Sequence, residues 1–200
     1  QGDAVIALGN IFGYADGMSY GVVSASNYKA TFFDGECAVI ATDIPAEEQG
    51  TGMLFNMDGE VVGMISSSVW NDTGKNVVNA YGISDLKPII ELLINGKSVP
   101  YIGIYGTTVT EQLAEEHKMP SGIYVADVDP DSPAMAAGIQ IGDIICEASG
   151  EEIKDIAAYQ NIVIGSSVGE TMEFVGKRLG SDGYVNIKFS VVTTEKEEVK

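Results

Sequence analysis

Residues 1–84 alternate short apolar stretches with glycine and aspartate, a pattern typical of short β-strands joined by tight turns. The clearest buried strands are predicted at residues 3–10 (DAVIALGN) and 36–43 (ECAVIATD). Residues 18–32 carry β-branched and aromatic side chains and a predicted Ser/Asn turn, and residues 59–70 follow a turn at 56–59 as in a hairpin. Strands at this spacing predict an antiparallel barrel or sandwich.

The apolar spacing becomes helical after residue 84, with apolar residues at Leu86, Ile89, Ile90 and Leu93. We predict a helix that has Ser84 or Asp85 as its N-cap and ends at Asn95-Gly96. Pro88 then falls in the first turn, where proline is tolerated.

Residues 101–192 alternate predicted strands with two short helices. Residues 121–150 read as strand, turn, short helix, glycine stop and strand, and residues 171–192 read as a closing hairpin. The second helix, over residues 153–165, places Ile156, Tyr159 and Val163 on one face.

The change of pattern predicts two domains. We place the first at residues 1–97 and the second at residues 98–194, with the boundary near Ser98 in the linker NGKSVP. Residues 195–200 are a charged tail that we expect to be frayed.

Composition then restricts the partners. The formal net charge of −18 disfavours nucleic acid and anionic lipid surfaces, because both are themselves negative. We find no apolar run of about 18 residues, so no membrane insertion of this chain is expected. His117 is the only histidine, so we expect no metal site and no cofactor, and Cys37 and Cys146 are predicted to be free, partly buried thiols.

Several motifs together resemble the HtrA family, trypsin-like serine proteases followed by a PDZ domain. They are GDAVIALGNIFG (2–13, with Ile11 where proline is usual), GVVSA (21–25), Thr42-Asp43, NMDGEVVGMIS (56–66), AYGIS (80–84), YIGI (101–104) and SPAMAAGIQIGDII (132–145). The resemblance implies a mainly β protein: the second trypsin-like antiparallel β-barrel, a linker helix, and a PDZ α+β domain. It also suggests a piece of a longer chain.

The segment that should hold the catalytic serine departs from the family pattern. Counting forward from Thr42-Asp43 places Thr51 at the serine position and Gln49 at the first glycine, whereas counting back from Leu54 places Gly50 at the serine position. The loop, which continues to Gly52, is one residue short, and neither count gives a serine.

Acyl transfer needs an activated hydroxyl, a histidine base and two backbone amides that stabilise the oxyanion. Gln49 and the missing residue should misaim those amides. The histidine and aspartate of the family belong to the first barrel, which this chain lacks, and His117 lies in the PDZ-like half within a polar stretch where we expect it to be solvated. The resemblance therefore implies a pseudoprotease, with an active serine endopeptidase as the alternative.

Residues Tyr101, Ile102, Gly103 and Ile104 correspond to the carboxylate-binding signature of HtrA-type PDZ domains. The resemblance implies that their amides bind the C-terminal carboxylate of a peptide, which adds as a strand along residues 104–107, opposite the helix with Tyr159 and Val163. The alternative is a plain core strand.

Two functions compete with the active-protease interpretation on these residues. One is a protein of extracytoplasmic quality control that binds unfolded or C-terminal peptides, secreted or tethered to a membrane by an upstream segment. The other is a structural module whose groove is blocked. Absence of the first barrel should expose an apolar face, so we also predict a homo-oligomer or a longer native chain.

Overall fold

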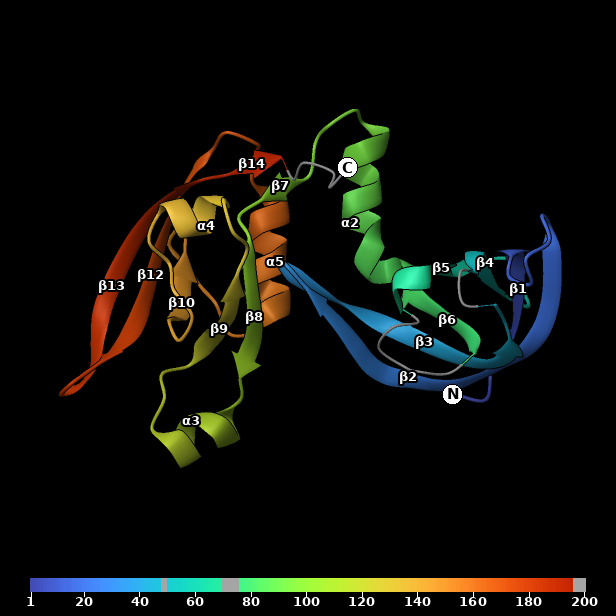
Figure 1. The fold of residues 1–200 in the computed structure, drawn as a ribbon, viewed down its shortest axis with the longest axis horizontal. Coiled ribbons are helices and arrows are strands. Elements are labelled where there is room, and N and C mark those ends of the chain that lie inside the picture. Colours follow the sequence, from blue (N-terminus) through green and yellow to red (C-terminus); the bar gives the residue numbers. More distant parts are fainter. Residues whose placement is uncertain (48–49, 70–75, 196–200) are drawn as a thin grey trace. The chain divides into compact units, whose positions relative to one another are not determined.

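A computed structural model describes residues 1–47, 50–69 and 76–195 of the chain (Figure 1). The chain forms two compact units. Unit 1 comprises Gln1–Ala30 and Cys37–Ile90, and unit 2 comprises Thr31–Glu36 and Glu91–Lys200. Thr31–Glu36, the hairpin tip, thus packs with unit 2 although both flanking strands belong to unit 1. The division at residues 97/98 stays a prediction.

Unit 1 is a closed antiparallel barrel with the strand order β1-β2-β3-β6-β5-β4, which confirms the predicted barrel. Its strands are β1 (Ala4–Asn10), β2 (Gly17–Phe32), β3 (Gly35–Pro45), β4 (Thr51–Asn56), β5 (Val61–Ile65) and β6 (Val77–Gly82). Closure pairs the first strand with the fourth, in the register Val5↔Asn56 to Asn10↔Thr51. Alternate residues fill the interior, among them Val5, Ala7, Ile44, Leu54 and Val78.

The predicted Ser/Asn turn within residues 18–32 is wrong, because β2 continues through it from Gly17 to Phe32. Pairing with β1 ends at Val22. Beyond that point most residues up to Lys29 are exposed or half-buried. Polar side chains can therefore face solvent from an uninterrupted strand, and they do not require a turn.

The predicted turn at 56–59 is confirmed, and Asn56 organises it. Its Oδ1 accepts hydrogen bonds from the amides of Asp58 and Glu60, at 3.0 and 2.9 Å. An asparagine that bonds the backbone two residues on is a common way to fix a tight turn.

A short 3-10 helix, η1 (Ser67–Val69), follows β5.

Helix α2 (Ile83–Ile94) begins earlier than predicted, and unit 1 ends within it, at Ile90. Pro88 consequently lies inside the helix and not in its first turn. Asp85, predicted as a possible N-cap, instead accepts a hydrogen bond from the Ala38 amide at 2.8 Å, which ties the helix to β3. A tertiary contact has thus replaced the local cap.

Unit 2 contains a sheet in the order β13-β12-β10-β9-β8, with β11 paired to β10 and a separate β14-β7 pair. Its strands are β7 (Pro100–Tyr101), β8 (Ile104–Val109), β9 (Gly122–Val128), β10 (Ile144–Ala148), β11 (Glu151–Glu152), β12 (Thr171–Gly180), β13 (Gly183–Val192) and β14 (Thr194–Glu195). Its helices are α3 (Glu111–His117), α4 (Pro133–Ala136) and α5 (Ile156–Gly165). Strand β8 forms one edge of the sheet.

Helix α3 was missed by the prediction of two helices. Its apolar content is low and none of its residues is buried, so no apolar periodicity marks it. Local capping holds it, since Thr110 accepts from the Leu113 amide and Lys118 closes it in the left-handed conformation. Helices α4 and α5 begin with N-caps of the same kind, Ser132 and Asp155.

One apolar core fills unit 2 between α5 and the sheet. Tyr159 and Val163 of α5 are buried there with Phe174, and the Tyr159 and Phe174 rings lie 6.4 Å apart. Ile102 and Ile104 belong to the same core. The chain around residue 103 is therefore fixed by its two apolar neighbours.

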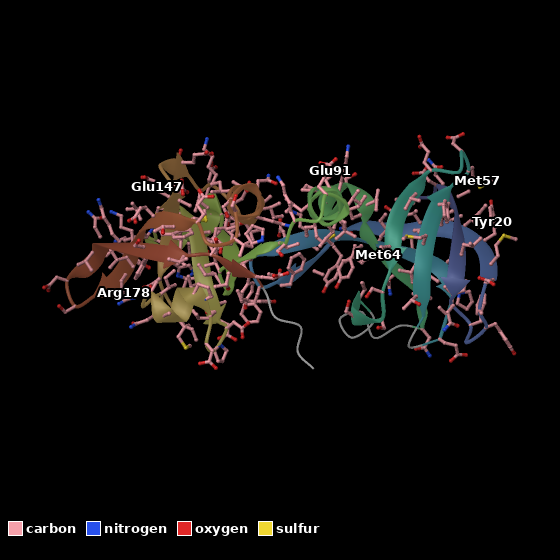
Figure 2. All side chains as sticks on the ribbon, turned by 90° about the horizontal axis from the view of Figure 1, so that it is seen from above. Tyr20, Met57, Met64, Glu91, Glu147 and Arg178 are labelled. Carbon is pink, nitrogen blue, oxygen red and sulfur yellow. The ribbon has the colours of Figure 1, made fainter. Side chains whose placement is uncertain are left out.

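A buried carboxylate follows the motif glycine in IGDII. Asp143 is 1% exposed and accepts two hydrogen bonds from Arg178, at 2.6 and 2.7 Å, and one from the Gln140 amide. Arg178 also donates to the carbonyl of Gly138 and is labelled in Figure 2. This bidentate pair links the turn before β10 to β12.

We expect Asp143→Asn to lower the free energy of unfolding by about 1–3 kcal/mol, because Arg178 and the Gln140 amide lose an anionic acceptor. Urea denaturation followed by circular dichroism measures the loss. Asp182→Asn, in the exposed β12–β13 turn, is the matched control and should change little. Equal stability of the two variants would contradict this role for the pair.

Candidate functional site

The nucleophile segment (Gln49–Gly52) follows a well-anchored strand in unit 1. Thr42 is buried, donates to the Val78 carbonyl at 2.7 Å and accepts from the Ile44 amide at 3.2 Å. The carboxylate of Asp43 accepts from the Val22 amide at 2.7 Å. The Thr42-Asp43 pair therefore fixes the backbone that leads into the segment.

Main-chain pairing occupies the candidate nucleophile positions themselves. The Gly50 amide donates to the Glu47 carbonyl at 3.0 Å. Thr51 is exposed and begins β4 opposite Asn10, and Gly52 lies opposite Gly9. Gln49, the predicted degenerate oxyanion residue, lies outside the described residues.

Gly52 permits the close approach of β4 to β1. A Cβ there would lie 2.2 Å from the Leu8 carbonyl oxygen, closer than any side chain could be accommodated. The strand ladder thus extends through Thr51 and Gly52. This part of the described segment presents a β-strand, with Thr51 as its hydroxyl residue.

His117 is exposed in the last turn of α3, as the sequence predicts for a solvated residue. It belongs to unit 2, whereas Thr51 belongs to unit 1. Among the described residues no cluster of histidine, cysteine and acidic side chains could hold a metal ion. The unit that carries the candidate nucleophile thus contains no histidine base, because His117 is the only one in the chain.

The loop Tyr101–Ile104 in unit 2 presents consecutive main-chain amides to one carboxylate, that of Asp34. The amides of Ile102 and Gly103 both donate to Oδ2 at 2.7 Å, and the amide of Ile104 donates to Oδ1 at 2.9 Å. Three amides that converge in this way form an anion-binding nest.

Glycine is required at position 103. Its φ is +93°, and a Cβ would lie 2.4 Å from the Cβ of Ser132. The carbonyls of the loop point to the other side, where Ile102 accepts from the Ala134 amide and Gly103 accepts from the Asp129 amide. These bonds orient the peptide planes so that their N–H groups face Asp34.

Two tyrosines complete the surroundings of the carboxylate. The Tyr159 hydroxyl donates to Asp34 Oδ1 at 2.6 Å, and the Tyr101 hydroxyl donates to Asp129. Burial raises the pKa of Tyr159, and the nearby Asp34 carboxylate raises it further; burial also raises the pKa of Tyr101, with Asp129 adding to the effect. Both phenols therefore remain hydrogen-bond donors at neutral pH.

Asp34 is 8% exposed. Burial raises the pKa of its carboxyl group, and the hydrogen bonds from Tyr159 and the three amides act in the opposite direction. Hydrogen bonds to both oxygens replace the water that burial removes.

The structure brings together most of the predicted peptide-binding residues. Ile102, Gly103, Ile104 and Tyr159 surround one carboxylate. Val163 lies one turn further along α5 and is packed in the core. Tyr101 contributes through Asp129 and shapes the loop.

Sequence reasoning missed Asp34. Its only local signal is the dipeptide Asp34-Gly35, which is typical of a hairpin turn, and Asp34 does adopt the left-handed conformation with φ 65°. That signal predicts a turn and says nothing of what the side chain binds.

The edge strand of the sheet lies next to the loop. Strand β8 begins at Ile104 and pairs with β9 on one side. On the other side α5 contacts β8, and the Ile156 amide donates to the Thr108 hydroxyl at 3.1 Å. A loop of converging amides beside an edge strand and a helix is the arrangement that accepts a peptide by strand addition.

These features define a trypsin-like β-barrel joined to a PDZ domain. The PDZ domain family matches residues 124–178. The probable periplasmic serine endoprotease DegP-like of Halomonas elongata is 30% identical over 193 residues, 93% of this chain and 40% of that relative. Periplasmic serine endoprotease DegP of Escherichia coli K12 is 29% identical over 194 residues, 94% of this chain and 41% of that relative.

Solved structures agree. The serine endoprotease from Yersinia pestis has a TM-score of 0.58 at 25% identity and covers 98% of this chain and 63% of its own. The HtrA-type protease AlgW with tripeptide has a TM-score of 0.62 at 22% identity. The match covers 98% of this chain and 66% of the AlgW chain. The chain is homologous to the DegP/HtrA serine proteases, over their second barrel and PDZ domain. It spans about 40% of the length of those curated relatives.

An alanine in the left-handed conformation costs about 1–2 kcal/mol. We expect Gly103→Ala to destabilise unit 2 by more than this, because its Cβ also meets Ser132. Urea denaturation and the amide chemical shifts of residues 102–104 provide the measurement. The control is Gly169→Ala, which has a similar φ of +85° and open space around its Cβ. Equal losses in the two variants would show that the loop tolerates a side chain.

Proposed function

We propose that this protein binds the C-termini of unfolded or damaged polypeptides through its PDZ domain. The observation that carries the proposal is the convergence of the Ile102, Gly103 and Ile104 amides on a single carboxylate. A peptide C-terminus presents the same chemical group. Unlike a side-chain carboxylate, it lies at the end of a main chain, and the residues that precede it would run along β8.

Main-chain pairing would supply affinity along the edge of β8, and the neighbouring side chains would select the ligand. Tyr105 is half-buried at this edge, and the walls of the loop are apolar. Apolar peptide ends fit these surroundings, whereas the net charge of −18 disfavours acidic tails. The AlgW structure was solved with a tripeptide, which is consistent with a polypeptide ligand for this fold.

We further propose that the barrel does not cleave peptides. Thr51 is held in a strand ladder, the Gly50 amide is bonded to Glu47, and the chain offers no histidine in unit 1. The alternative, an active serine endopeptidase with an irregular nucleophile loop, is supported by the names of the relatives.

We place this activity in extracytoplasmic protein quality control, because the curated relatives named above are periplasmic. No helix among the described residues has the length and hydropathy needed to cross a bilayer. Tethering by an upstream segment remains part of the proposal.

Association with another copy is the final part of the proposal. Leu8, Met18, Tyr20 and Met53 are 41–68% exposed. The strand registers Leu8↔Met18 and Leu8↔Met53 make three of them neighbours, and Tyr20 is labelled in Figure 2. An apolar surface of this kind favours self-association or a protein partner.

We expect a peptide ending in Ala-Val-Val with a free carboxylate to bind at least about tenfold more tightly than its C-terminal amide, since the amide forfeits charge-assisted hydrogen bonds of about 1.5–3 kcal/mol. Fluorescence anisotropy with labelled peptides measures the ratio. Gly103→Ala should remove the difference, whereas Gly169→Ala should keep it. Equal affinity for acid and amide would contradict recognition of the terminus.

We expect a fluorophosphonate probe to leave the protein unlabelled and casein to remain intact, because no activated hydroxyl is available. Intact-mass spectrometry and gel analysis detect both reactions, and Thr51→Val is the control for modification at this site. Labelling that disappears in Thr51→Val would establish the endopeptidase alternative.

A further inference from the structure

The hairpin tip (Thr31–Glu36) occupies the place that a peptide terminus would take, and it does so within unit 2. The Asp34 carboxylate of the tip accepts hydrogen bonds from the amides of Ile102, Gly103 and Ile104. Its backbone also joins the edge strand, because the Asp34 amide donates to the Ile104 carbonyl at 2.7 Å. Asp34 therefore makes both kinds of main-chain bond that the last residue of a bound peptide would make.

The neighbours of Asp34 in the tip contact both β8 and α5. The Phe33 ring meets the Tyr105 ring of β8 edge-on, with centroids 5.8 Å apart. On the α5 side, the Glu36 amide donates to Gln160 Oε1 at 3.1 Å, and a Cβ at Gly35 would lie 2.6 Å from the Gln160 side chain. The tip thus contacts the loop, β8 and α5.

The donor arrangement makes the two ligands mutually exclusive. Both oxygens of Asp34 are in use, and Tyr159 supplies a fourth donor. A second carboxylate would need the same amides and would repel the first across a short distance. Binding of a terminus therefore requires that Asp34 leave.

We propose that the hairpin tip is an internal ligand of the carboxylate-binding loop and that Asp34 must be displaced before a peptide C-terminus can bind. This inference rests on the proposed function and adds its regulation. The apparent dissociation constant is then the intrinsic one divided by the fraction of molecules in which the tip is undocked.

The test measures peptide affinity and amide protection on the whole chain. Asp34→Asn and Asp34→Gly both remove the anionic carboxylate, and both residues tolerate the left-handed φ of 65° at this turn. The matched control is Asp16→Asn, an exposed aspartate with a φ of 59° in unit 1. The probe is the fluorescein-labelled Ala-Val-Val peptide with a free carboxylate.

We expect both Asp34 variants to bind the probe about tenfold or more tightly than the wild type, because the docked fraction no longer competes. In the free variants the amides of 102–104 should exchange faster with deuterium than in the wild type. Saturating the wild type with peptide should expose the Asp34 amide, which is bonded to Ile104 when docked. Asp16→Asn should match the wild type in every measurement.

Unchanged or weaker peptide binding by both Asp34 variants, with unchanged protection of residues 102–104, would overturn the internal ligand and leave the proposed function standing. A different failure is separable from this one. If neither the wild type nor either variant binds the probe, the proposed function falls, and competition between tip and peptide falls with it.

Discussion

The hydrogen bonds between the Asp34 carboxylate and the amides of residues 102–104 set the arrangement of the site, because each partner would be costly without the other. A buried carboxylate loses its hydration, and buried amides that lack an acceptor lose theirs. Ile102 and Ile104 place the loop by packing in the core, and Gly103 lets it turn sharply enough for all three amides to face one point. The phenol of Tyr159 then supplies the fourth hydrogen bond to the carboxylate.

Two sets of backbone amides in this chain are used differently: one set binds a carboxylate, and the other bonds to main-chain carbonyls. In unit 2 the amides of the loop are directed at an anion because their carbonyls are held from behind by Ala134 and Asp129. In unit 1 the amide of Gly50 is used internally, and Thr51 and Gly52 lie in a ladder with β1. Anion stabilisation depends on amides that are kept out of such ladders, so the first arrangement suits binding and the second does not suit oxyanion chemistry.

The hairpin tip lies between β2 and β3 in the sequence, and its contacts with the binding loop lie within unit 2. Both β2 and β3 lead directly into it, and β3 continues to Thr42-Asp43, before the nucleophile segment. Regulation in this scheme needs no new contact, only a change in which carboxylate the loop holds.

Prediction from sequence succeeded where a local pattern and a packing requirement coincide. Alternating apolar residues gave the barrel strands and the turn at Asn56, and helical spacing gave α5 with Tyr159 and Val163 on its buried face. It failed where a longer-range contact replaced the local one. An example is the early start of α2, where Asp85 accepts from the Ala38 amide instead of capping the helix. It also failed where the local pattern was misleading or weak, because polar side chains lie on the unbroken β2 and no apolar periodicity marks α3.

The sequence by itself determined the two kinds of domain, the glycine that shapes the binding loop, and the lack of a serine in the nucleophile segment. Only the tertiary structure decided what the loop holds. Asp34 is 68 residues away from Ile102 and 125 from Tyr159, and its own neighbourhood encodes no more than a turn. A side chain's partner at such a distance is set by how the whole chain folds, because no local propensity acts across it.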